Sequence, residues 1–378
     1  MKYRIKLIGL IVAITTLLTG CSDKETEQSK PQYFDLNKVH EFPKTEFKEV
    51  DITETRLNVE RYDITLPKGS YCGGYSVYGN NIYYSIIYPD PRQIGGEFEK
   101  EYNTSIWNYR IDTKDGECIY KYDLDYCIEI PRMKCNQDVL VWSDYFSVNG
   151  FSLRYAYTHN IGESTKIKVG KEDVYFQDVN PTLTEDHMYW YEMKLDEMGG
   201  FILNKYNFEE GITYKERENI SLVSPYQQLY ICESIYAVCE QNVEGKYNII
   251  IYDMEKEKEE IIEISEIPED IICNSRYCIW TLDGSGVKSN RIYVYSTKYK
   301  QMMSINVGSI FSYALIDNIV IVNGELGVIA YNLDTKEKTE IFPEQLLYTN
   351  MGNDNNVYLK FINTDESMLS IMNITTSG

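Results

Sequence analysis

The sequence has few of the residues on which hydrolytic enzymes depend. Its 378 residues include three histidines, and it contains neither a His-Glu-x-x-His zinc motif nor a Gly-x-Ser-x-Gly nucleophile turn. His40 lies in a polar N-terminal segment, His159 at a turn, and His187 at the start of a strand-like run. We interpret each as a surface or turn residue, because a Ser-His-Asp triad would need His159 or His187 beside a nucleophile.

Two short runs are the remaining candidates for a ligand or metal site. Gly284-Ser-Gly286 follows Asp283, but neither a lysine nor a helical pattern comes after it as in a phosphate-binding loop. Residues 352–356 carry oxygen-bearing side chains that could bind calcium. Both runs stand where a turn between strands is expected. We therefore predict turns here, with no cofactor and no metal site.

Positive charge is scarce in this chain. It has 37 Lys and Arg against 58 Asp and Glu, which gives a formal charge of −21. An acidic surface repels the phosphates of nucleic acids and anionic lipid headgroups. The sequence also has no basic patch with interleaved aromatic residues. Nucleic-acid binding is therefore excluded.

Cysteines are few and widely spaced. Eight follow Cys21: Cys72, Cys118, Cys127, Cys135, Cys232, Cys239, Cys273 and Cys278. None forms a Cys-x-x-Cys pair, so a zinc site is not expected. An even number in an exported protein allows disulfides. Several, such as Cys232 and Cys278, stand at apolar positions of strand-like runs and could equally be small buried side chains.

The first twenty residues have the three parts of a secretory signal. Three cations within the first six residues precede an apolar run over residues 7–18. A membrane-spanning helix needs about 20 apolar residues, so this run is short for one. It ends in Leu18-Thr-Gly-Cys21, which resembles the lipobox of bacterial lipoproteins. The resemblance implies cleavage between Gly20 and Cys21 and a diacylglyceryl group on Cys21. An ordinary signal peptide, or an anchor helix with a chance cysteine, is the alternative.

Lipidation would hold the mature chain on the extracytoplasmic face of the cell membrane. Each buried CH₂ contributes about 0.8 kcal/mol, so two acyl chains anchor stably where one does not. Residues 22 to about 52 are polar and lack apolar periodicity, which is typical of a flexible spacer. The predicted organisation is a cleaved signal at 1–20, a lipidated cysteine and flexible spacer at 21–52, and one domain at 53–378.

The domain repeats one motif, a polar turn followed by a short apolar or aromatic run. The apolar parts of its seven copies begin at Ile82, Val139, Met188, Ile235, Tyr277, Ile319 and Val357. The spacings are 57, 49, 47, 42, 42 and 38 residues, close to the roughly 40–50 residues of a four-stranded propeller blade. Tyrosine, present 35 times, and the β-branched residues favour strands. Residues 254–264 could be helical, but they are equally consistent with a turn between strands.

A second motif follows the first and alternates apolar and polar residues around a tyrosine. Copies include Ile106-Trp-Asn-Tyr-Arg-Ile-Asp112, Phe201-Ile-Leu-Asn-Lys-Tyr-Asn207 and Val328-Ile-Ala-Tyr-Asn-Leu-Asp334. Two of them end in an Asp-Thr-Lys turn, which suits a tight hairpin. A short outer strand, such as residues 117–120, comes next. Each unit thus supplies four strands, from an inner strand to an outer edge.

The repeat predicts an all-β fold, a seven-bladed β-propeller. The last unit, residues 345–378, ends after its third strand, and residues 56–66 form a strand that can complete it. Pairing this N-terminal strand with the last blade would close the ring and remove a sheet edge. A pair of β-sandwiches and a six-bladed ring are the alternatives that remain open.

Two of the repeated units carry a family resemblance. Asn80-Asn-Ile-Tyr-Tyr84 and Tyr331-Asn-Leu-Asp-Thr-Lys336 resemble units of bacterial lipoproteins whose propeller is similar to that of low-density-lipoprotein receptors. More distantly, they resemble TolB-type periplasmic propellers. The resemblance covers about residues 55–378, and its motifs belong to the blades. It implies a propeller displayed outside the membrane, and it carries over no catalytic residue.

A rigid propeller without an active-site motif favours a non-catalytic binding module for a protein, peptide or glycan. We expect a partner contact first at the insertion over residues 88–102, because loops on a rigid scaffold often carry function. The alternative is a hydrolase or lyase of cell-surface glycans, although the repeated Ser-x-Asp-x-Gly-x-x-Trp turns of sialidase-like propellers are missing. Three or more convergent Asp, Glu, Arg or His in the channel would favour this enzyme. A lining of Tyr and small polar residues would favour binding. A structural or sensory partner of a membrane complex is a third hypothesis.

Overall fold

The computed structural model places strands through most of the chain. It describes residues 31–43, 46–89, 103–122, 128–146, 150–167, 169, 179–194, 200–223, 227–282, 290–343, 348–351, 356–361 and 368–376. Within these ranges the regular structure is β-strands and short 3-10 turns, arranged in six sheets. No helix in the described part of the chain is long and apolar enough to cross a bilayer. The predicted signal sequence and Cys21 lie outside the described residues.

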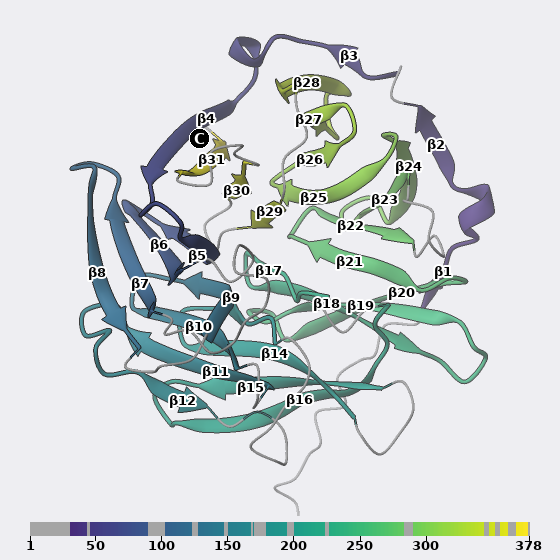
Figure 1. Ribbon diagram of the computed structural model, residues 1–378. Helices are drawn as coiled ribbons and strands as arrows, with labels where there is room; N and C mark the ends of the chain where they lie inside the picture. The colour runs from purple at the N-terminus through teal and green to yellow at the C-terminus, as the bar shows by residue number, and fades with distance from the viewer. Residues whose placement is uncertain are drawn as a thin grey trace, which may run out of the picture.

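The first two sheets are antiparallel and follow the chain order. One contains β5 (Tyr71–Tyr78), β6 (Asn81–Tyr88), β7 (Asn103–Arg110) and β8 (Asp115–Lys121). The next contains β9 (Ile128–Cys135), β10 (Val139–Phe146), β11 (Gly150–Tyr157) and β12 (Thr165–Ile167). In both, the first strand lies toward the centre of the molecule and the fourth toward its rim (Figure 1).

The largest sheet combines two groups of four strands. The first group is β13 (Thr182–Leu183), β14 (His187–Met193), β15 (Phe201–Asn207) and β16 (Ile212–Ile220). The second group is β17 (Ile231–Cys232), β18 (Ile235–Gln241), β19 (Tyr247–Asp253) and β20 (Lys258–Ile264). The pair Ile220–Glu240 joins β16 to β18. Residues 254–257 form the turn before β20, so this segment is a turn and a strand rather than a helix.

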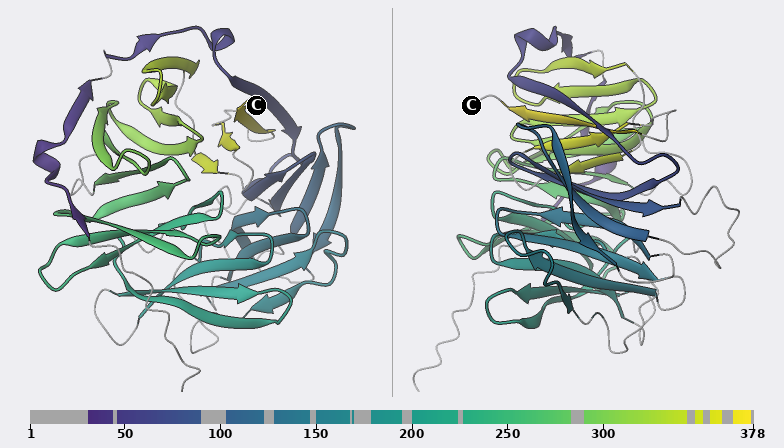
Figure 2. Two further views of the ribbon diagram at one scale, coloured as in Figure 1. Left: turned by 180° about the vertical axis from the view of Figure 1, so that it is seen from behind. Right: turned by 60° about the vertical axis from the view of Figure 1, so that its left-hand side comes forward.

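Two further sheets repeat the same order. One contains β21 (Pro268–Cys273), β22 (Tyr277–Leu282), β23 (Arg291–Ser296) and β24 (Gln301–Asn306). The other contains β25 (Ile310–Ile316), β26 (Ile319–Gly324), β27 (Gly327–Asn332) and β28 (Glu337–Phe342). Figure 1 and the left view of Figure 2 show the ring face-on from opposite sides. In both, the sheets are arranged around a common centre.

The last sheet joins the two ends of the domain. It contains β29 (Tyr348–Met351), β30 (Val357–Lys360), β31 (Met368–Thr376) and β4 (Leu57–Thr65). β4 pairs antiparallel with β31, from Met368 opposite Thr65 to Thr376 opposite Leu57. The N-terminal strand expected at residues 56–66 therefore lies beside the last strand of the chain.

The segment before β4 differs from the expected flexible spacer. β1 (Gln32–Tyr33), β2 (His40–Pro43) and β3 (Lys48–Glu49) pair in parallel with the outer strands β20, β24 and β28. The short turns η1 (Leu36–Lys38) and η3 (Ile52–Glu54) connect these pieces. We call residues 31–54 the strap, and Figure 2 shows it along the outer rim of three sheets.

Two effects hold the strap in place. It pairs with outer strands whose edges would otherwise be open, since an edge strand leaves backbone groups without partners. Apolar side chains of the strap are also buried against the sheets, whereas a flexible spacer would leave them exposed. Leu36 and Phe47 are almost fully buried, and the ring of Phe47 lies 5.2 Å from that of Tyr331. These contacts correct the spacer prediction for the described residues up to 52.

All seven copies of the repeated motif lie on strands. Their apolar runs fall on β6, β10, β14, β18, β22, β26 and β30, the second strand of each group. The tyrosine motifs at residues 106–112, 201–207 and 328–334 fall on the third strands β7, β15 and β27. The turn motif also behaves as expected. Lys114 and Lys336 end the two Asp-Thr-Lys turns at φ of 59° and 57°, the left-handed conformation that a tight hairpin uses.

The core lies between neighbouring sheets. Trp142, Trp190 and Trp280 stand on second strands and are fully buried. Each belongs to a hydrophobic cluster with residues of the preceding sheet: Trp142 with Ile106, and Trp190 with Leu153. Because each sheet is apolar on both faces, it can bury them only against its neighbours. This packing fixes the spacing of the innermost strands.

Candidate functional site

Strands near the centre of the ring line a partly open cavity of about 480 Å³. Its walls come from β5, β9, β21 and β30 and from the segments that precede β13 and β17. Three tyrosines, two side-chain amides and five charged side chains face it: Tyr71, Tyr75, Tyr230, Asn180, Gln228, Glu129, Arg132, Lys134, Asp270 and Lys360. This is within the size range of small-molecule sites in proteins, which is about 300–1,000 Å³.

The cavity lies beside the two shortest innermost strands among the described residues. β13 and β17 each have two residues, whereas β5 and β9 each have eight. In place of longer strands, the side chains of Asn180 and Gln228 complete the wall. The amide nitrogen of Asn180 donates to the Gln228 carbonyl oxygen over 3.4 Å, which ties the two segments together.

On the opposite wall, two glycines let β5 approach β9. A Cβ atom on Gly73 would lie 2.6 Å from the carbonyl oxygen of Ile130, and one on Gly74 would lie 2.9 Å from the same atom. No other residue fits such a close approach between two backbones. The hydroxyl of Ser85 lies 3.3 Å from the Gly74 carbonyl oxygen and 3.2 Å from that of Ile130, which adds a polar link at this contact.

Positive charge gathers on this side of the cavity. Arg132 and Lys134 stand on β9, and Lys360 ends β30. The Lys134 side chain is almost fully buried, and burial lowers its pKa to about 8. This value includes smaller, opposing effects: the charge of Cys135 raises the pKa and the charge of Arg132 lowers it. Lys360 donates from Nζ to the carbonyl oxygen of Cys72 over 3.0 Å.

Asp270 stands on β21, the opposite wall, in an unusual backbone conformation. Its φ is 48°, within a register irregularity between Glu269 and Ile272. This conformation costs a residue with a side chain about 1–2 kcal/mol. The Tyr313 hydroxyl lies 2.8 Å from the Glu269 carbonyl oxygen and 2.6 Å from that of Asp270, which fixes the bulge. Burial, with a smaller effect from the Glu269 carboxylate, raises the pKa of Asp270 to about 6.

Tyr230 links the two walls electrostatically. Burial raises the pKa of its hydroxyl, the charge of Asp270 raises it further, and the charge of Arg132 lowers it. The charges of Asp270 and Arg132, which stand on different walls, therefore both act on the Tyr230 hydroxyl. A ligand that fills the cavity would meet a carboxylate and two cations on β9, at Glu129, Arg132 and Lys134, and a further carboxyl group at Asp270 on β21.

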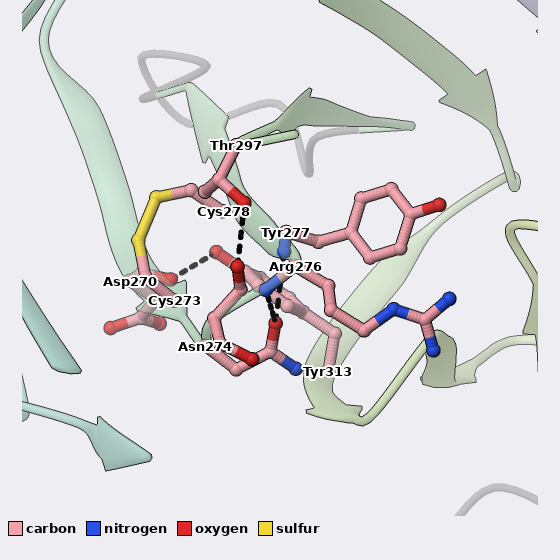
Figure 3. Close-up of a disulfide and its surroundings, with 9 residues drawn as sticks. Asp270, Cys273, Asn274, Arg276, Tyr277, Cys278, Thr297 and Tyr313 are labelled. Carbon is pink, nitrogen blue, oxygen red and sulfur yellow. Dashed lines mark hydrogen bonds between the residues drawn. A yellow bond between two sulfur atoms is a disulfide. The ribbon is translucent and has the colours of Figure 1, made fainter. Parts of the chain in front are cut away.

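A disulfide between Cys273 and Cys278 supports the acidic wall. It connects β21 to β22, three residues after Asp270 (Figure 3). Cys273 and Cys278 are directly opposite each other in the strand pair, and both are fully buried. Of the other described cysteines, Cys72, Cys135, Cys232 and Cys239 are buried thiols and Cys118 is an exposed one. The described cysteines therefore include both a disulfide and buried thiols that pack as small side chains.

The three histidines lie away from the cavity. His40 is exposed on β2 in the strap, and its ring contacts Phe42 edge-on. His159 is exposed at a turn and stacks on Tyr157. His187 begins β14, where Nε2 lies 3.3 Å from the Asn207 amide nitrogen, and burial lowers its pKa. None of the three lines the cavity.

Several predicted features fall outside the described residues. These are Gly20 and Cys21, residues 90–102 of the insertion at 88–102, the turn at Asp283–Gly286 and most of the run at 352–356. Among the residues that the structure does describe, no group of three or more His, Cys, Asp or Glu side chains could hold a metal ion. The cavity is thus the candidate site. The sequence predicted a channel, but it did not predict the residues that line this cavity. The Gly73-Gly74 pair inside an apolar strand was the available signal.

Comparison with known proteins supports the fold. No family model matches the chain, and no curated protein matches its sequence. The solved β-propeller domain of the Trilobed protease from Pyrococcus furiosus is 13% identical with a TM-score of 0.53, covering 78% of this chain and 91% of that chain. The acylaminoacyl peptidase of Pyrococcus horikoshii is 10% identical with a TM-score of 0.52, covering 78% of this chain and 50% of that one.

These likenesses show a β-propeller fold and nothing about activity. The all-β propeller predicted from the repeat is confirmed at that level. TolB from Acinetobacter baumannii is 9% identical over 72% of this chain and 77% of that chain, and its TM-score of 0.38 adds no support. The lipoprotein assignment and the likeness to low-density-lipoprotein receptors stay predictions.

Proposed function

We propose that this protein is a lipid-anchored propeller on the extracytoplasmic face of a cell membrane. Its central cavity binds a protein segment, a peptide or a glycan without changing it chemically. One observation carries the binding proposal: tyrosines, side-chain amides and charged groups line one cavity near the centre of the ring. Such a lining suits recognition, because aromatic faces supply contact area and a few fixed polar groups supply orientation.

In this proposal the ring has seven blades and is closed by β4. The seven second strands each carry one copy of the repeated motif, and the nine-stranded sheet divides into two blades at Ile220–Glu240. β4 then serves as the outer strand of the last blade, because it pairs with β31 along its whole length. A closed ring keeps the cavity walls in fixed positions without a hinge.

The anchor in this proposal is a diacylglyceryl group on Cys21, exposed by cleavage after Gly20. Ten residues separate Cys21 from Gln32, where β1 begins. Ten residues reach at most about 36 Å. Because the strap binds the rim of the ring, the tether is shorter than a spacer running to residue 52 would be. The rim near β20 would therefore lie close to the bilayer.

The proposal is tested by filling the cavity. Asn180→Trp places an indole among the lining side chains, whereas Asn160→Trp adds the same group at an exposed turn. Both variants and the unaltered protein are screened against an array of bacterial envelope glycans and a peptide library. We expect a ligand that binds the unaltered protein and Asn160→Trp but not Asn180→Trp. Equal binding by all three would place the site elsewhere and overturn the proposal.

A glycan hydrolase or lyase is the second candidate, and the lining meets the criterion set for it, because Glu129, Arg132 and Asp270 converge on the cavity. Glu129 and Asp270 face the same cavity, and a carboxyl group with a pKa near 6 suits a general acid. If the unaltered protein cleaves a glycan and both Asp270→Asn and Glu129→Gln lose this activity, the protein is an enzyme rather than a binding module. Glycan binding by the unaltered protein without any product after long incubation would rule out the enzyme hypothesis.

A further inference from the structure

Asp270 is the one charged side chain of the cavity without a partner among the residues that the structure describes. Lys360 donates to a backbone carbonyl oxygen over 3.0 Å, and Glu129, Arg132 and Lys134 also have partners within the protein. Within the described part of the chain, no hydrogen bond or ion pair reaches the Asp270 carboxylate, and no cation lowers its pKa. The lining therefore leaves one negative group uncompensated.

The position of this carboxylate costs folding free energy in two ways. Residue 270 has a φ of 48°, and the Tyr313 hydroxyl bonds its carbonyl oxygen over 2.6 Å, so this bond ends on the backbone rather than on the carboxylate (Figure 3). The side chain is partly accessible from the cavity, yet protein atoms surround most of it, and burial raises its pKa to about 6. A left-handed backbone and an unpaired, largely desolvated charge are both unfavourable. Such costs are typical of residues that serve a ligand.

A positive charge is what the surroundings of Asp270 lack. A carboxylate in a protein interior is stabilised by an opposite charge at hydrogen-bonding distance. The neighbouring Glu269 carboxylate has the reverse effect, because its charge adds to the effect of burial and raises the pKa of Asp270. A neutral hydroxyl would donate a hydrogen bond but leave the charge in place. The placement of Asp270 therefore favours a ligand with a cationic group.

Tyrosines supply much of the remaining surroundings of Asp270. Burial raises the pKa values of Tyr191, Tyr230 and Tyr313, and the charge of Asp270 raises each of them further. Because Coulomb interactions weaken with distance, these three hydroxyl groups lie near the carboxylate. Aromatic rings pack on the methylene stem of a lysine or the plane of an arginine and attract the cation. The described residues offer no group of three or more acidic, His or Cys side chains for a metal ion, so an organic cation fits better.

The two side-chain amides of the lining match a peptide unit. The Asn180 amide nitrogen donates to the Gln228 carbonyl oxygen over 3.4 Å. Each side-chain amide has a donor and an acceptor, so this bond leaves the Asn180 oxygen and the Gln228 nitrogen. Neither has a further partner among the described residues. A peptide backbone offers one N–H and one C=O per residue, which pair with this acceptor and this donor.

We infer that the cavity binds a peptide whose lysine or arginine side chain pairs with the Asp270 carboxylate and whose backbone meets Asn180 and Gln228. The inference rests on the proposed function and names the ligand class of the same site. The volume of about 480 Å³ accommodates one such side chain with its adjoining peptide units rather than a folded domain. The cations on β9 and β30 keep the positive group of the ligand on the β21 side of the cavity. An amino sugar also carries an ammonium group and is the competing ligand class.

The experiment measures the binding of five small probes by calorimetry. The salt concentration is about 0.15 M, at which exposed charges are screened beyond about 8 Å. Three probes are tripeptides blocked at both ends, with lysine, arginine or glutamine at the centre. Butylamine carries the ammonium group without a peptide, and D-glucosamine carries it on a sugar. We expect the lysine or the arginine peptide to bind at least tenfold more tightly than the glutamine peptide, butylamine and glucosamine, about 1.4 kcal/mol.

Matched variants identify the carboxylate. Asp270→Asn removes the charge at nearly constant size, and Asp138→Asn makes the same change at an exposed turn. We expect at least a tenfold loss of basic-peptide affinity in Asp270→Asn, with the affinity for the glutamine peptide unchanged, and no change in Asp138→Asn. Gln228→Ala tests the backbone contact and keeps the carboxylate. It should weaken all three peptides alike and leave the binding of butylamine unchanged.

Binding of the basic peptide should also strengthen as the pH rises through about 6, where Asp270 loses its proton. Besides the three tyrosines, which stay neutral in this range, the charged groups near it are Glu269 on its own strand and, in the cavity, Glu129, Arg132, Lys134 and Lys360. Ending the titration near pH 7 keeps Lys134, with its pKa of about 8, mainly in one state. The same increase in Asp270→Asn would contradict the assignment.

The outcomes separate this inference from the proposed function. Equal affinity for the glutamine peptide and the basic peptides, tighter binding of glucosamine or butylamine, an undiminished preference for the basic peptides in Asp270→Asn, or no saturable binding of either basic peptide would each overturn the inference. The proposed function would survive any of these if the array yields a ligand that Asn180→Trp excludes. It would fail on its own if Asn180→Trp binds every array ligand as the unaltered protein does.

Discussion

The side-chain amide nitrogen of Asn274 donates to the backbone carbonyl oxygen of Asp317 over 2.7 Å, which joins the turn of one sheet to the turn of the next. The Asn274 carbonyl oxygen accepts from the backbone nitrogens of Arg276 and Tyr277, so one buried side chain shapes its own turn and binds its neighbour's. Asn136 repeats the arrangement and donates to the Thr184 carbonyl oxygen over 2.7 Å. The sheets are therefore connected by polar links as well as apolar packing.

Removing this link should destabilise the ring. In Asn274→Ala, the carbonyl of Asp317 and two backbone nitrogens lose a buried partner. Leaving such groups unsatisfied costs about 1–3 kcal/mol. We expect a fall of that size in the free energy of unfolding, measured by urea denaturation, and a similar fall in Asn136→Ala.

Two comparison variants separate the two roles of the asparagine. Asn274→Asp keeps the acceptor for its own turn and loses the donor to Asp317, so its loss of stability isolates the link between sheets. Asn160→Ala, at an exposed turn, should leave stability unchanged. If Asn274→Ala were as stable as Asn160→Ala, the asparagine would have no structural role.

The raised pKa of Asp270 predicts how stability depends on pH. Its pKa is about 6 in the folded chain against an ordinary value of 3.8. Between these values the folded state binds more protons than the unfolded state, so the free energy of unfolding falls as the pH rises from about 4 to about 6. The cost is complete above pH 6 and reaches at most about 3 kcal/mol. Asp270→Asn should therefore be more stable than the unaltered protein at neutral pH.

The control for this prediction is Asp138→Asn, a change at an exposed turn of the same chain. It should follow the pH dependence of the unaltered protein. Asn also tolerates the left-handed conformation of residue 270, so backbone strain does not obscure the comparison. A stability curve that is the same for Asp270→Asn and the unaltered protein from pH 4 to pH 8 would show that this carboxyl group is not buried.

The strands of this fold could be predicted because each copy of the motif carries its own signal. Tyr277, Ile319 and Val357 each follow a polar turn and begin a second strand. The pairing of residues 56–66 with the last unit also followed, because that unit otherwise lacked an outer strand. The alternation of apolar and polar residues and the spacing of 38–57 residues were sufficient to predict the strands. Each repeated unit buries its apolar faces against the next one, so every unit has to keep this pattern.

The strap and the cavity could not be predicted in the same way. Phe34, Leu36 and Phe47 are isolated apolar residues in a polar segment. The two phenylalanine rings pack on Tyr295 and Tyr331, which lie 261 and 284 residues further along the chain. Lys134 is buried although lysine is a polar residue, and it lines the cavity together with residues from several other parts of the chain, which is a tertiary feature.

The strap should contribute to stability and to solubility. Removing residues 22–52 exposes the edges of β20, β24 and β28 and uncovers the apolar residues that Leu36 and Phe47 contact. Open edges pair with other chains. We expect a lower midpoint of thermal unfolding and concentration-dependent association, measured by calorimetry and light scattering.

Truncation to residue 66 is the informative comparison for the strap. It removes β4 as well, and with it the antiparallel partner of β31. This longer deletion should abolish cooperative unfolding, whereas the shorter one should only lower its midpoint. If the two deletions gave the same melting curve as the full domain, neither segment would hold the ring together.

The lipid anchor is tested by Cys21→Ser, which removes the thiol that would carry the diacylglyceryl group. Two acyl chains bind a bilayer stably, because each buried CH₂ contributes about 0.8 kcal/mol. We expect the unaltered chain to fractionate with membranes after a high-salt wash and Cys21→Ser to appear in the soluble fraction or to retain its signal. Cys118→Ser, at the exposed thiol on β8, controls for loss of a cysteine. Salt-resistant membrane attachment of Cys21→Ser with a cleaved signal would mean that the ring is held by protein or headgroup contacts, and the short tether from Cys21 to the strap would then have no mechanical role.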